Sequence, residues 1–418
     1  MKVDAKSLFS ELALNGPPLF FPDADSTITF NFDQGLAAEE TFPLQELQDL
    51  AGEILDRDGG RALEYITFGF DAANDQIIYL PTYIELVLGN TELREQLRTW
   101  VGEKNSRPDL TAESFIVTSG SVQAIAMAMT AFLSPGEGAL VEAATFPYAM
   151  RFMEMRGADV RPVAIDRDGI DVADLERQIL RLEADGIRPK LLYVIPTFQL
   201  PTCVVTPLER RHRIIELAHE HEMVVVEDSV YADLRYDGDP VPSLLSMDDS
   251  GLVIQSHGFS KIVAPALRLG WMTGSPEMIA GLAAVRQDLG VSQWMCRVMA
   301  EFMRQGRLDP HIERANAVYR RKRDVAVNAV REHCAPYVGF DQPSGGFFLW
   351  LRMSDDVDWA RARSSAEAAG VMCRPGEVFM GRDDGQRHLR LAYSHVADHE
   401  IERGIRALGE AIHGAVRT

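Results

Sequence analysis

A lysine beside a small hydroxyl residue, Ser260-Lys261, followed by Arg268, is the part of the chain best suited to covalent chemistry. A lysine amine forms a Schiff base with a carbonyl compound, and the guanidinium fork of an arginine binds a phosphate through two parallel hydrogen bonds. Upstream, Asp228 and Tyr231 follow a run of apolar, β-branched residues. These residue types together suit an aldehyde cofactor that carries a phosphate.

The segment Thr118-Ser-Gly-Ser-Val-Gln123 offers a place for such a phosphate. It follows a predicted strand and precedes an apolar helix. Small residues there let backbone N–H groups approach an anion at the helix N-terminus, where the helix dipole favours negative charge. The motif alone is common, but its position relative to Asp228 and Lys261 predicts that the phosphate-binding residues are Gly120, Ser121, Val122 and Gln123.

In order and spacing, Asp228, Tyr231, Ser260-Lys261 and Arg268 resemble the aspartate-aminotransferase superfamily. These are the fold-type-I, class I and II aminotransferase-like enzymes that use pyridoxal phosphate. The resemblance runs from about residue 28 to the C-terminus. It implies that Lys261 forms the Schiff base, that Asp228 faces the pyridine nitrogen of pyridoxal 5'-phosphate, and that Tyr231 reaches the ring hydroxyl. It also implies that Ser260 and Arg268 belong to the cofactor site. The competing interpretation is a loop lysine and a surface arginine.

Three more segments resemble the family's site. Glu142-Ala-Ala-Thr-Phe-Pro-Tyr148 implies that Phe146 lies flat on the pyridine ring, against the alternative of a core phenylalanine at a strand end. His388-Leu-Arg-Leu-Ala392 implies that Arg390 binds the substrate α-carboxylate, for which a bidentate guanidinium is suited; the alternative is a strand arginine in a surface ion pair. Phe30-Asn-Phe-Asp-Gln-Gly35 implies that Gly35 lets the backbone approach the substrate.

The resemblance also implies a homodimer with shared active sites. Ala62-Leu-Glu-Tyr65 resembles the place where a tyrosine crosses the dimer interface to the phosphate of the neighbouring subunit, which makes Tyr65 a predicted cofactor-binding residue. Residues 66–88 are longer than the family pattern, so we expect an additional loop near the active-site entrance. Tyr79 and Tyr83, which lie in this stretch, remain alternatives to Tyr65.

Departures from the family pattern cluster around the cofactor. Where the family has Asn-Pro-x-Gly, the chain reads Gln199-Leu-Pro-Thr-Cys203. Leu200 therefore stands among the cofactor-binding residues in place of an asparagine that donates to the ring oxygen, and leucine donates nothing. Cys203 replaces a glycine, so the turn either keeps φ negative or accepts strain. Gly258 occupies the usual position of a phosphate-binding hydroxyl residue, for which Ser256 or His257 is a possible substitute.

The secondary structure predicted around these residues indicates an α/β fold. Short apolar runs suited to buried strands alternate with helical segments, which favours a mostly parallel, helix-flanked sheet. A long charged helix, a strand near residues 346–351 and a final helix follow. The family resemblance assigns residues 50–290 to a large pyridoxal-phosphate-binding domain and residues 291–418 to a small C-terminal domain. Residues 1–49 form an N-terminal arm and part of the small domain.

The composition and charge of the chain disfavour several classes of partner. The chain has 418 residues, 46% of them hydrophobic, and a formal charge of −20. A strongly acidic chain disfavours nucleic-acid binding, which needs a concentrated basic surface. The four cysteines show no metal-ligand spacing and are typical of reduced thiols in a cytoplasmic protein. No secretory signal and no membrane-spanning stretch is evident, and we expect no metal.

Three functional hypotheses follow. The first is an aminotransferase-like enzyme that acts on an α-amino acid, with a 2-oxoacid as a possible acceptor, in which released Lys261 moves a proton between the substrate Cα and the cofactor. The second is a non-transaminating enzyme on the same scaffold, such as a cyclase, an oxidase, or a β- or γ-eliminating or replacing enzyme. The third, a non-catalytic regulator, requires a DNA-binding module for which the N-terminal segment is too short.

Overall fold

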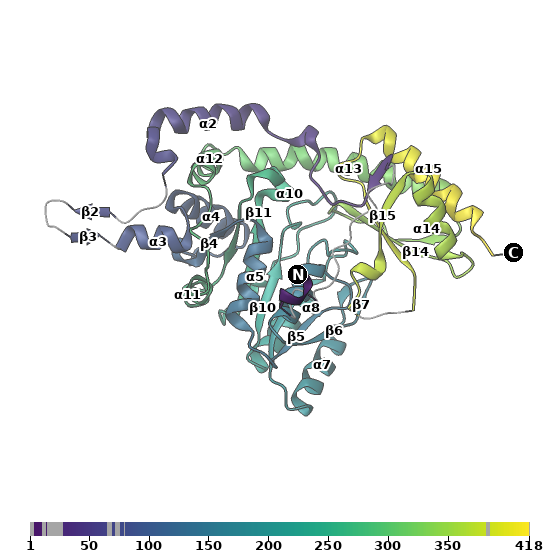
Figure 1. Ribbon diagram of the computed structural model, residues 1–418, viewed down its shortest axis with the longest axis horizontal. Coiled ribbons are helices and arrows are strands. Elements are labelled where there is room, and N and C mark those ends of the chain that lie inside the picture. The colour runs from purple at the N-terminus through teal and green to yellow at the C-terminus, as the bar shows by residue number, and fades with distance from the viewer. Residues whose placement is uncertain are drawn as a thin grey trace.

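The computed structural model describes residues 4–10, 14, 28–64, 69–71, 76–78, 80–381 and 385–417 of the chain. Its centre is a seven-stranded sheet, drawn in teal and green in Figure 1. Neighbouring strands are parallel except for β12, which is antiparallel to both of its neighbours. The strand order is β4 (Phe115–Thr118), β12 (Gly270–Thr273), β11 (Val253–Gly258), β10 (Val224–Asp228), β9 (Pro189–Val194), β5 (Gly138–Glu142) and β6 (Asp159–Val163). This confirms the predicted α/β class.

Helices cover the large sheet, and their ends follow from local sequence. Ser275 accepts a hydrogen bond from the Met278 N–H at the start of α11, where Pro276 occupies the first turn. Asn90 caps α4 in the same way. The helices are α4 (Thr91–Lys104), α5 (Ser121–Phe132), α6 (Pro147–Met155), α7 (Val172–Ala184), α8 (Leu208–Glu220), α9 (Leu244–Met247), α10 (Phe259–Ile262) and α11 (Pro276–Ala284).

A second sheet of five strands joins the two ends of the chain. Its order is β1 (Phe30–Phe32), β15 (Val371–Pro375), β16 (His388–Ala392), β14 (Phe348–Met353) and β13 (Val338–Gly339). The N-terminal strand β1 is parallel to β15, and the other neighbours are antiparallel. Around this sheet lie α13 (Leu308–His333), α14 (Trp359–Ala368) and α15 (Asp398–Gly414). The domain boundaries at residues 49–50 and 290–291 stay a prediction.

Short elements complete the described fold. A two-stranded ribbon pairs β7 (Ile165–Asp166) with β8 (Gly169–Ile170). Single 3₁₀ turns are η1 (Ala5–Leu8), η2 (Glu39–Thr41), η3 (Gly59–Ala62), η4 (Ala112–Ser114), η5 (Pro265–Leu267) and η6 (Gly376–Val378). None of the helices in the described part of the chain has the length and apolar character needed to cross a membrane.

The expectation of a loop at residues 66–88 is wrong. The described part of this stretch contains a hairpin of β2 (Gly69–Asp71) and β3 (Gln76–Ile78), followed by α3 (Leu80–Leu88). β-Branched residues in β3 favour a strand, and the apolar run after them suits a packed helix. In Figure 1 the hairpin extends away from the body of the molecule.

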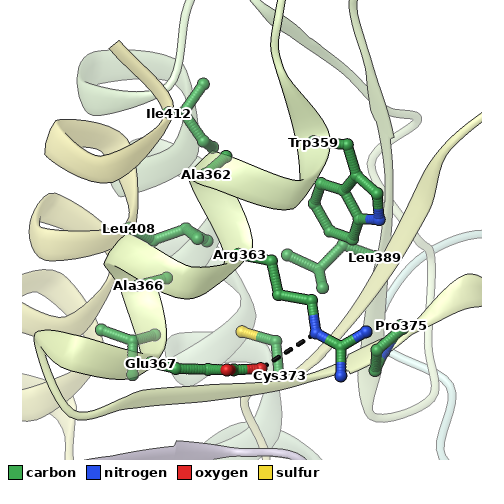
Figure 2. A pocket seen from close by; sticks show the side chains of 11 residues that line it. Trp359, Ala362, Arg363, Ala366, Glu367, Cys373, Pro375, Leu389, Leu408 and Ile412 are labelled. Carbon is green, nitrogen blue, oxygen red and sulfur yellow. Dashed lines mark hydrogen bonds and ion pairs between the residues drawn. The ribbon is translucent and has the colours of Figure 1, made fainter. Parts of the chain in front are cut away.

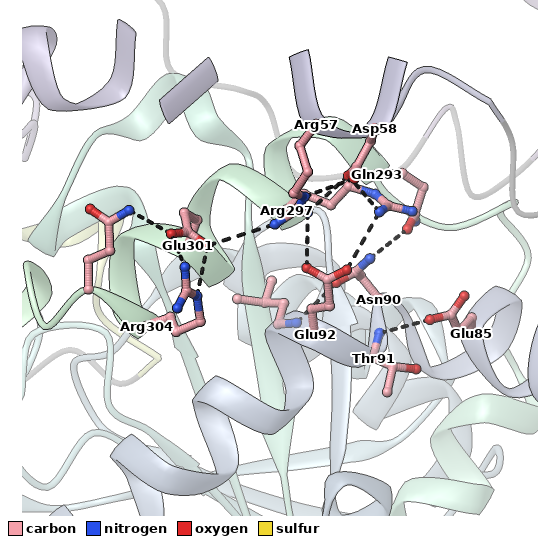
Figure 3. Close-up of polar contacts among 12 residues, drawn as sticks. Arg57, Asp58, Glu85, Asn90, Thr91, Glu92, Gln293, Arg297, Glu301 and Arg304 are labelled. Atoms are coloured by element: carbon pink, nitrogen blue, oxygen red, sulfur yellow. Dashed lines mark hydrogen bonds and ion pairs between the residues drawn. The ribbon is translucent and has the colours of Figure 1, made fainter. Parts of the chain in front are cut away.

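Ion pairs hold the N-terminal helix α2 (Leu44–Asp58) against two other helices, α12 (Gln293–Arg304) and α4 (Figure 3). Asp58 pairs with Arg297 of α12 at 2.9 Å, and Arg57 contacts Glu92 of α4 at 3.5 Å. The Trp294 indole donates to a backbone oxygen in the middle of α2. Because α2 follows β1 in the chain, these contacts also restrain the segment between the two elements, residues 33–43.

Candidate active site

Five strands of the large sheet end at one edge. β4, β5, β9, β10 and β11 run in the same direction, so their carboxyl ends lie together. In open α/β sheets ligands bind outside this edge. Gly120, Asp228 and Gly258 all stand at or just after these strand ends.

Asp228 is buried at the end of β10 and held by a tyrosine that the sequence did not single out. Tyr193 Oη donates to Asp228 Oδ2 at 2.6 Å, and the Val230 N–H donates to Oδ1 at 3.3 Å. Burial raises the pKa of Asp228, while the Tyr193 hydrogen bond and the nearby His257 and Lys261 oppose the rise. A buried carboxylate of this kind is a ready partner for a positive ring nitrogen. A tyrosine inside the apolar run of residues 191–195 was the available signal for Tyr193.

Lys261 lies in the one-turn helix α10, directly after β11. Its Nζ donates to the Gly35 backbone oxygen at 2.8 Å and lies 5.8 Å from the Tyr231 ring centre. Burial and the Arg390 guanidinium lower its pKa to about 8, against the opposing charge of Asp228. A far larger fraction of the amine is therefore uncharged at neutral pH than in an ordinary lysine, and the uncharged amine is the state that acts as a nucleophile or base.

A cluster of polar groups lies at the N-terminus of α5. Gly120 has φ +76°, and a Cβ there would lie 2.8 Å from Arg268 Nη2. Arg268 donates to the Ser119 oxygen at 3.1 Å and to Ser260 Oγ at 3.4 Å. The structure thus brings the predicted residues Gly120, Ser260 and Arg268 together with the first backbone N–H groups of the helix, at Ser121 and Val122. A cation, a hydroxyl and a helix N-terminus around a glycine fit the phosphate of pyridoxal phosphate.

Gln123 has a different set of contacts from the one expected of a phosphate ligand. Its Oε1 accepts the Ser119 N–H at 2.6 Å, and its Nε2 donates to Asp288. The side chain therefore supports the loop that carries Gly120.

His257 does not replace the hydroxyl missing at Gly258. Its Nδ1 accepts the Gly258 N–H at 2.7 Å, its Nε2 lies 2.9 Å from Asp233 Oδ2, and its ring stacks on Trp271 with centres 4.7 Å apart. Both ring nitrogens are therefore engaged. Ser256 Oγ is buried and has no hydrogen-bond partner among the described residues.

Leu200 is buried in a turn next to the segment that contains Phe146. Gln199 Nε2 donates to the Ala144 oxygen at 2.6 Å and so joins the two segments. Phe146 is half-buried, and its ring lies 5.4 Å from that of Tyr148. Cys203 has φ +57°, so the turn keeps the left-handed conformation without glycine, at a cost of about 1–2 kcal/mol.

Arg390 projects from β16 between two aromatic rings. Its guanidinium carbon lies 4.5 Å from the Phe348 ring centre and 4.8 Å from that of Phe379, and its Nη2 donates to the Asp33 backbone oxygen. Burial lowers its pKa to about 10, against the opposing influence of Tyr231 and Asp33. A guanidinium held in one orientation suits a planar carboxylate.

Lys261, Tyr231 and Arg390 thus lie near one another, with Gly35 beside the lysine. Tyr65 and Tyr79 lie outside the described residues, as does the side chain of Tyr83. Sequence reasoning missed Asp33 and Arg374, which form an ion pair beside Arg390.

Comparison with known proteins gives consistent results. The sequence model of the family described as "Aminotransferase class I and II" matches residues 84–408. The chain is 32% identical to aromatic-amino-acid aminotransferase 1 of Thermococcus litoralis, over 90% of this chain and 86% of that protein. It is 30% identical to 2-aminoadipate transaminase of Thermus thermophilus, over 92% and 90%. The crystal structure of Pyrococcus horikoshii kynurenine aminotransferase is similar with a TM-score of 0.87 and 30% identity, over 98% of each chain.

Proposed function

The chain belongs to the aminotransferase class I and II family, and on that premise we propose which of its residues carry the transfer of an amino group. Family membership confirms the predicted superfamily, the pyridoxal phosphate cofactor and the assignment as a transferase that acts on amino acids. The roles of individual residues, the reaction partners and the assembly are proposals.

The cofactor is held by groups from the edge of the large sheet. Lys261 would bind it covalently, Asp228 would be the partner of its ring nitrogen, and Tyr231 the partner of its ring oxygen. Arg268, Ser260 and the N-terminus of α5, which begins after Gly120, would hold its phosphate. The observation that carries this proposal is geometric: Lys261 Nζ lies 5.8 Å from the Tyr231 ring centre, and Lys261 follows β11, the neighbour of the strand β10 that ends at the buried Asp228.

The protein's own residues divide the work of the reaction. Bound pyridoxal phosphate supplies a carbonyl that links to an amine and a ring that withdraws electrons from the adjacent carbon. Arg390 orients the substrate through its carboxylate. Lys261 Nζ would accept the proton from the substrate Cα and carry it. The Asp228 carboxylate, which accepts from Tyr193, would stabilise a positive charge on the ring nitrogen.

The substrate is an α-amino acid, and we propose a 2-oxoacid as the acceptor that completes the cycle. For the substrate we propose an apolar or aromatic side chain. The relatives named for aromatic amino acids and for kynurenine support this class. The test is mass analysis of products from an amino-acid panel, with and without 2-oxoacids. Formation of the matching 2-oxoacid only when an acceptor is present supports transamination.

Leu200 favours a second candidate, a non-transaminating reaction on the same scaffold. A leucine in the turn that approaches the cofactor provides no donor for the ring oxygen or the substrate carboxylate. The same product analysis separates the two: cyclised, oxidised or eliminated products formed without an acceptor identify the second reaction.

We further propose a cytoplasmic homodimer with shared active sites. All four cysteines are free thiols, and the hairpin β2–β3 extends away from its own subunit as an arm suited to reach a partner. Mixing Lys261→Ala subunits with Tyr65→Phe subunits tests the sharing. Recovered activity shows that Tyr65 acts at the phosphate of the neighbouring subunit. Recovery with Tyr79→Phe or Tyr83→Phe subunits instead assigns this role to residues 66–88. A monomer in sedimentation analysis contradicts the dimer.

A further inference from the structure

Hollows among the described residues differ in size and polarity. One lies between α14, α15 and the five-stranded sheet, and it measures about 20 Å³, room for a single water molecule (Figure 2). It is lined mainly by apolar side chains, and its charged residues Arg363 and Glu367 pair with each other at 2.9 Å. Another is a cleft of about 670 Å³ beside the large sheet, lined by polar and aromatic side chains that include Trp100, Lys104, Asp233 and His257.

The larger cleft lies across the sheet from the side to which Asp228 points. Side chains alternate between the two faces along a strand. β10 presents Glu227 to the cleft, and β11 presents His257. Asp228, which follows Glu227, therefore points the other way. His257 is the cleft residue next to Gly258, where β11 ends.

Three polar side chains and one backbone amide form a continuous chain of contacts from the cleft to Gly258. Lys104 Nζ donates to Asp233 Oδ1, and Asp233 Oδ2 lies 2.9 Å from His257 Nε2. His257 Nδ1 accepts the Gly258 N–H at 2.7 Å. Burial raises the pKa of Asp233, but Lys104 and His257 hold it well below its usual value. The carboxylate is therefore ionised and only accepts hydrogen bonds.

These contacts fix where the proton of the His257 ring lies. A nitrogen that accepts a backbone N–H carries no proton itself, so the ring proton is on Nε2 and is donated to Asp233. Asp233 thus selects the neutral tautomer whose Nδ1 accepts from Gly258. The ring is also restrained by packing: it stacks on Trp271 with centres 4.7 Å apart and is T-shaped to Trp100 with centres 6.0 Å apart.

Gly258 stands where β11 turns into the helix that carries Lys261. The next N–H, that of Phe259, donates at 3.0 Å to the backbone oxygen just before β12. Successive N–H groups of an extended strand point in opposite directions, so the Gly258 N–H points toward β10. The ladder with β10 ends at Ser256. A buried N–H beyond the ladder needs another acceptor, and His257 Nδ1 supplies it.

We propose that His257 and Asp233 are positioning residues for Lys261. Asp233 holds the tautomer of His257 that accepts the Gly258 N–H, and this hydrogen bond fixes the junction from which α10 presents Lys261. A Cβ on Gly258 would lie 3.8 Å from the Ser121 nitrogen, so the same junction borders the N-terminus of α5. The inference rests on the proposed function, because it takes Lys261 as the residue that binds the cofactor.

Three substitutions separate the parts of His257. His257→Asn keeps an acceptor near the place of Nδ1, His257→Gln keeps a donor near that of Nε2, and His257→Phe keeps only a stacking ring. Hydrogen exchange of the Gly258 amide in the apo protein, followed by mass spectrometry, should be about tenfold faster in the Gln and Phe variants and unchanged in His257→Asn. Schiff-base formation between the apo protein and pyridoxal phosphate, followed by absorbance, should slow about five- to tenfold in the same two variants.

Asp233→Ala tests the link from the carboxylate to the ring. Without Asp233 the ring proton is free to move to Nδ1, so the Gly258 amide should exchange severalfold faster and the Schiff base should form severalfold more slowly. In the His257→Asn background the same substitution should change neither rate, because an amide oxygen accepts without a choice of tautomer. Should the His257 variants fail to fold, Asp233→Ala alone carries the test through both rates.

His221→Phe is a matched control, because it removes a histidine whose Nδ1 lies 2.7 Å from Glu183 Oε1 at the end of α8; both rates should stay as in the wild type. Equal rates in the three His257 variants, or losses that follow thermal stability and not the acceptor, overturn the inference. An effect of Asp233→Ala that persists in the His257→Asn background overturns the role of Asp233. A wild type that forms no Schiff base, or forms it on another lysine, contradicts the proposed function instead, and exchange of the Gly258 amide still reports on His257.

Discussion

The two ends of the site are built in different ways. At the cofactor end, Gly120, Asp228 and Lys261 follow the carboxyl ends of β4, β10 and β11, three strands of one sheet that run in the same direction. At the substrate end, Asp33 and Arg390 contact each other although they lie 357 positions apart. The cofactor end therefore follows from local strand–helix units, and the substrate end depends on joining the two termini of the chain.

The difference shows where the reaction geometry is most easily disturbed. The segment after β1 is held at several points by residues distant in sequence: Lys261 donates to the Gly35 oxygen, Ser394 to the Leu36 oxygen, and Tyr319 accepts the Ala38 N–H. The first of these hydrogen bonds joins the cofactor end of the site, at Lys261, to the substrate end, at Gly35. Movement of this segment alters the surroundings of Arg390 and of Lys261 together, whereas the sheet edge stays fixed by its strand ladders.

The largest expected effect is at the cofactor end. Lys261→Ala removes the covalent link and the proton carrier, so we expect single-turnover transamination to fall by about 10³-fold or more. Lys190→Ala, on strand β9, serves as the control and should retain activity. Borohydride reduction of the wild type should place the cofactor mass on the peptide that contains Lys261. Labelling of a different lysine contradicts the assignment.

The phosphate cradle should give the next largest effect. In Gly120→Ala the new Cβ lies 2.8 Å from Arg268 Nη2 and φ is +76°, so the guanidinium must move. We expect cofactor affinity of the apo protein to fall about 10- to 100-fold, the loss of one or two charge-assisted hydrogen bonds. Gly136→Ala is a matched control, with φ +84° and no atom within 4 Å of the added Cβ. If both variants bind the cofactor equally well, Gly120 is needed only for its backbone conformation and not for the space that it leaves beside Arg268.

Tyr193→Phe should have a smaller effect, because it removes one hydrogen bond and keeps the packing. Asp228 then loses its 2.6 Å donor, its pKa rises further, and its pairing with the cofactor ring weakens. We expect about a tenfold loss of cofactor affinity in fluorescence titration. Asp228→Asn should cost more, and in that background Tyr193→Phe should add little. Independent, additive losses contradict a role for Tyr193 through Asp228.

Sequence reasoning named most of the residues that the structure gathers at the cofactor end, because these residues carry local signals, while their roles stay a prediction. The apolar runs that became β4, β5, β9, β10 and β11 predicted the sheet, and strand ends then predicted Asp228 and Gly120. Tyr193 was missed because its role depends on the register between β9 and β10, where it lies beside Val226. A single sequence does not contain that register.

At the substrate end, Arg390 and Gly35 were predicted from resemblance, while Asp33 and Arg374 were not. Their pairing depends on β1 joining β15, a contact between the two ends of the chain that no local pattern encodes. The hairpin in residues 66–88 was mistaken for a loop because two three-residue strands give too short an alternation to detect.

The pH dependence of cofactor uptake tests whether Arg390, at the substrate end, influences Lys261, at the cofactor end. Lys261 has a pKa of about 8, and only the uncharged amine attacks the cofactor carbonyl. Uptake of pyridoxal phosphate by the apo protein should therefore be slow at low pH and rise through about pH 8. Because Arg390 lowers this pKa, Arg390→Met should move the midpoint upward by about one pH unit. Arg374→Met should leave it nearly unchanged, and an equal shift in both variants contradicts a specific influence of Arg390.

The smallest expected effect concerns Leu200, where the chain departs from its family inside the cofactor end. Leucine leaves the ring oxygen with fewer donors, so the deprotonated Schiff base with Lys261 is less stabilised and its proton is held more tightly. Leu200→Asn adds a donor and should lower the Schiff-base pKa by about half a pH unit, as expected of one neutral hydrogen bond. Spectral titration measures this shift, and Leu200→Met, which adds no donor, should leave the pKa unchanged. If the native reaction is not transamination, Leu200→Asn should also increase the pyridoxamine phosphate formed per turnover, because the amide offers the substrate carboxylate a second partner beside Arg390. An unchanged pKa together with fast wild-type transamination makes Leu200 a tolerated substitution within an ordinary aminotransferase.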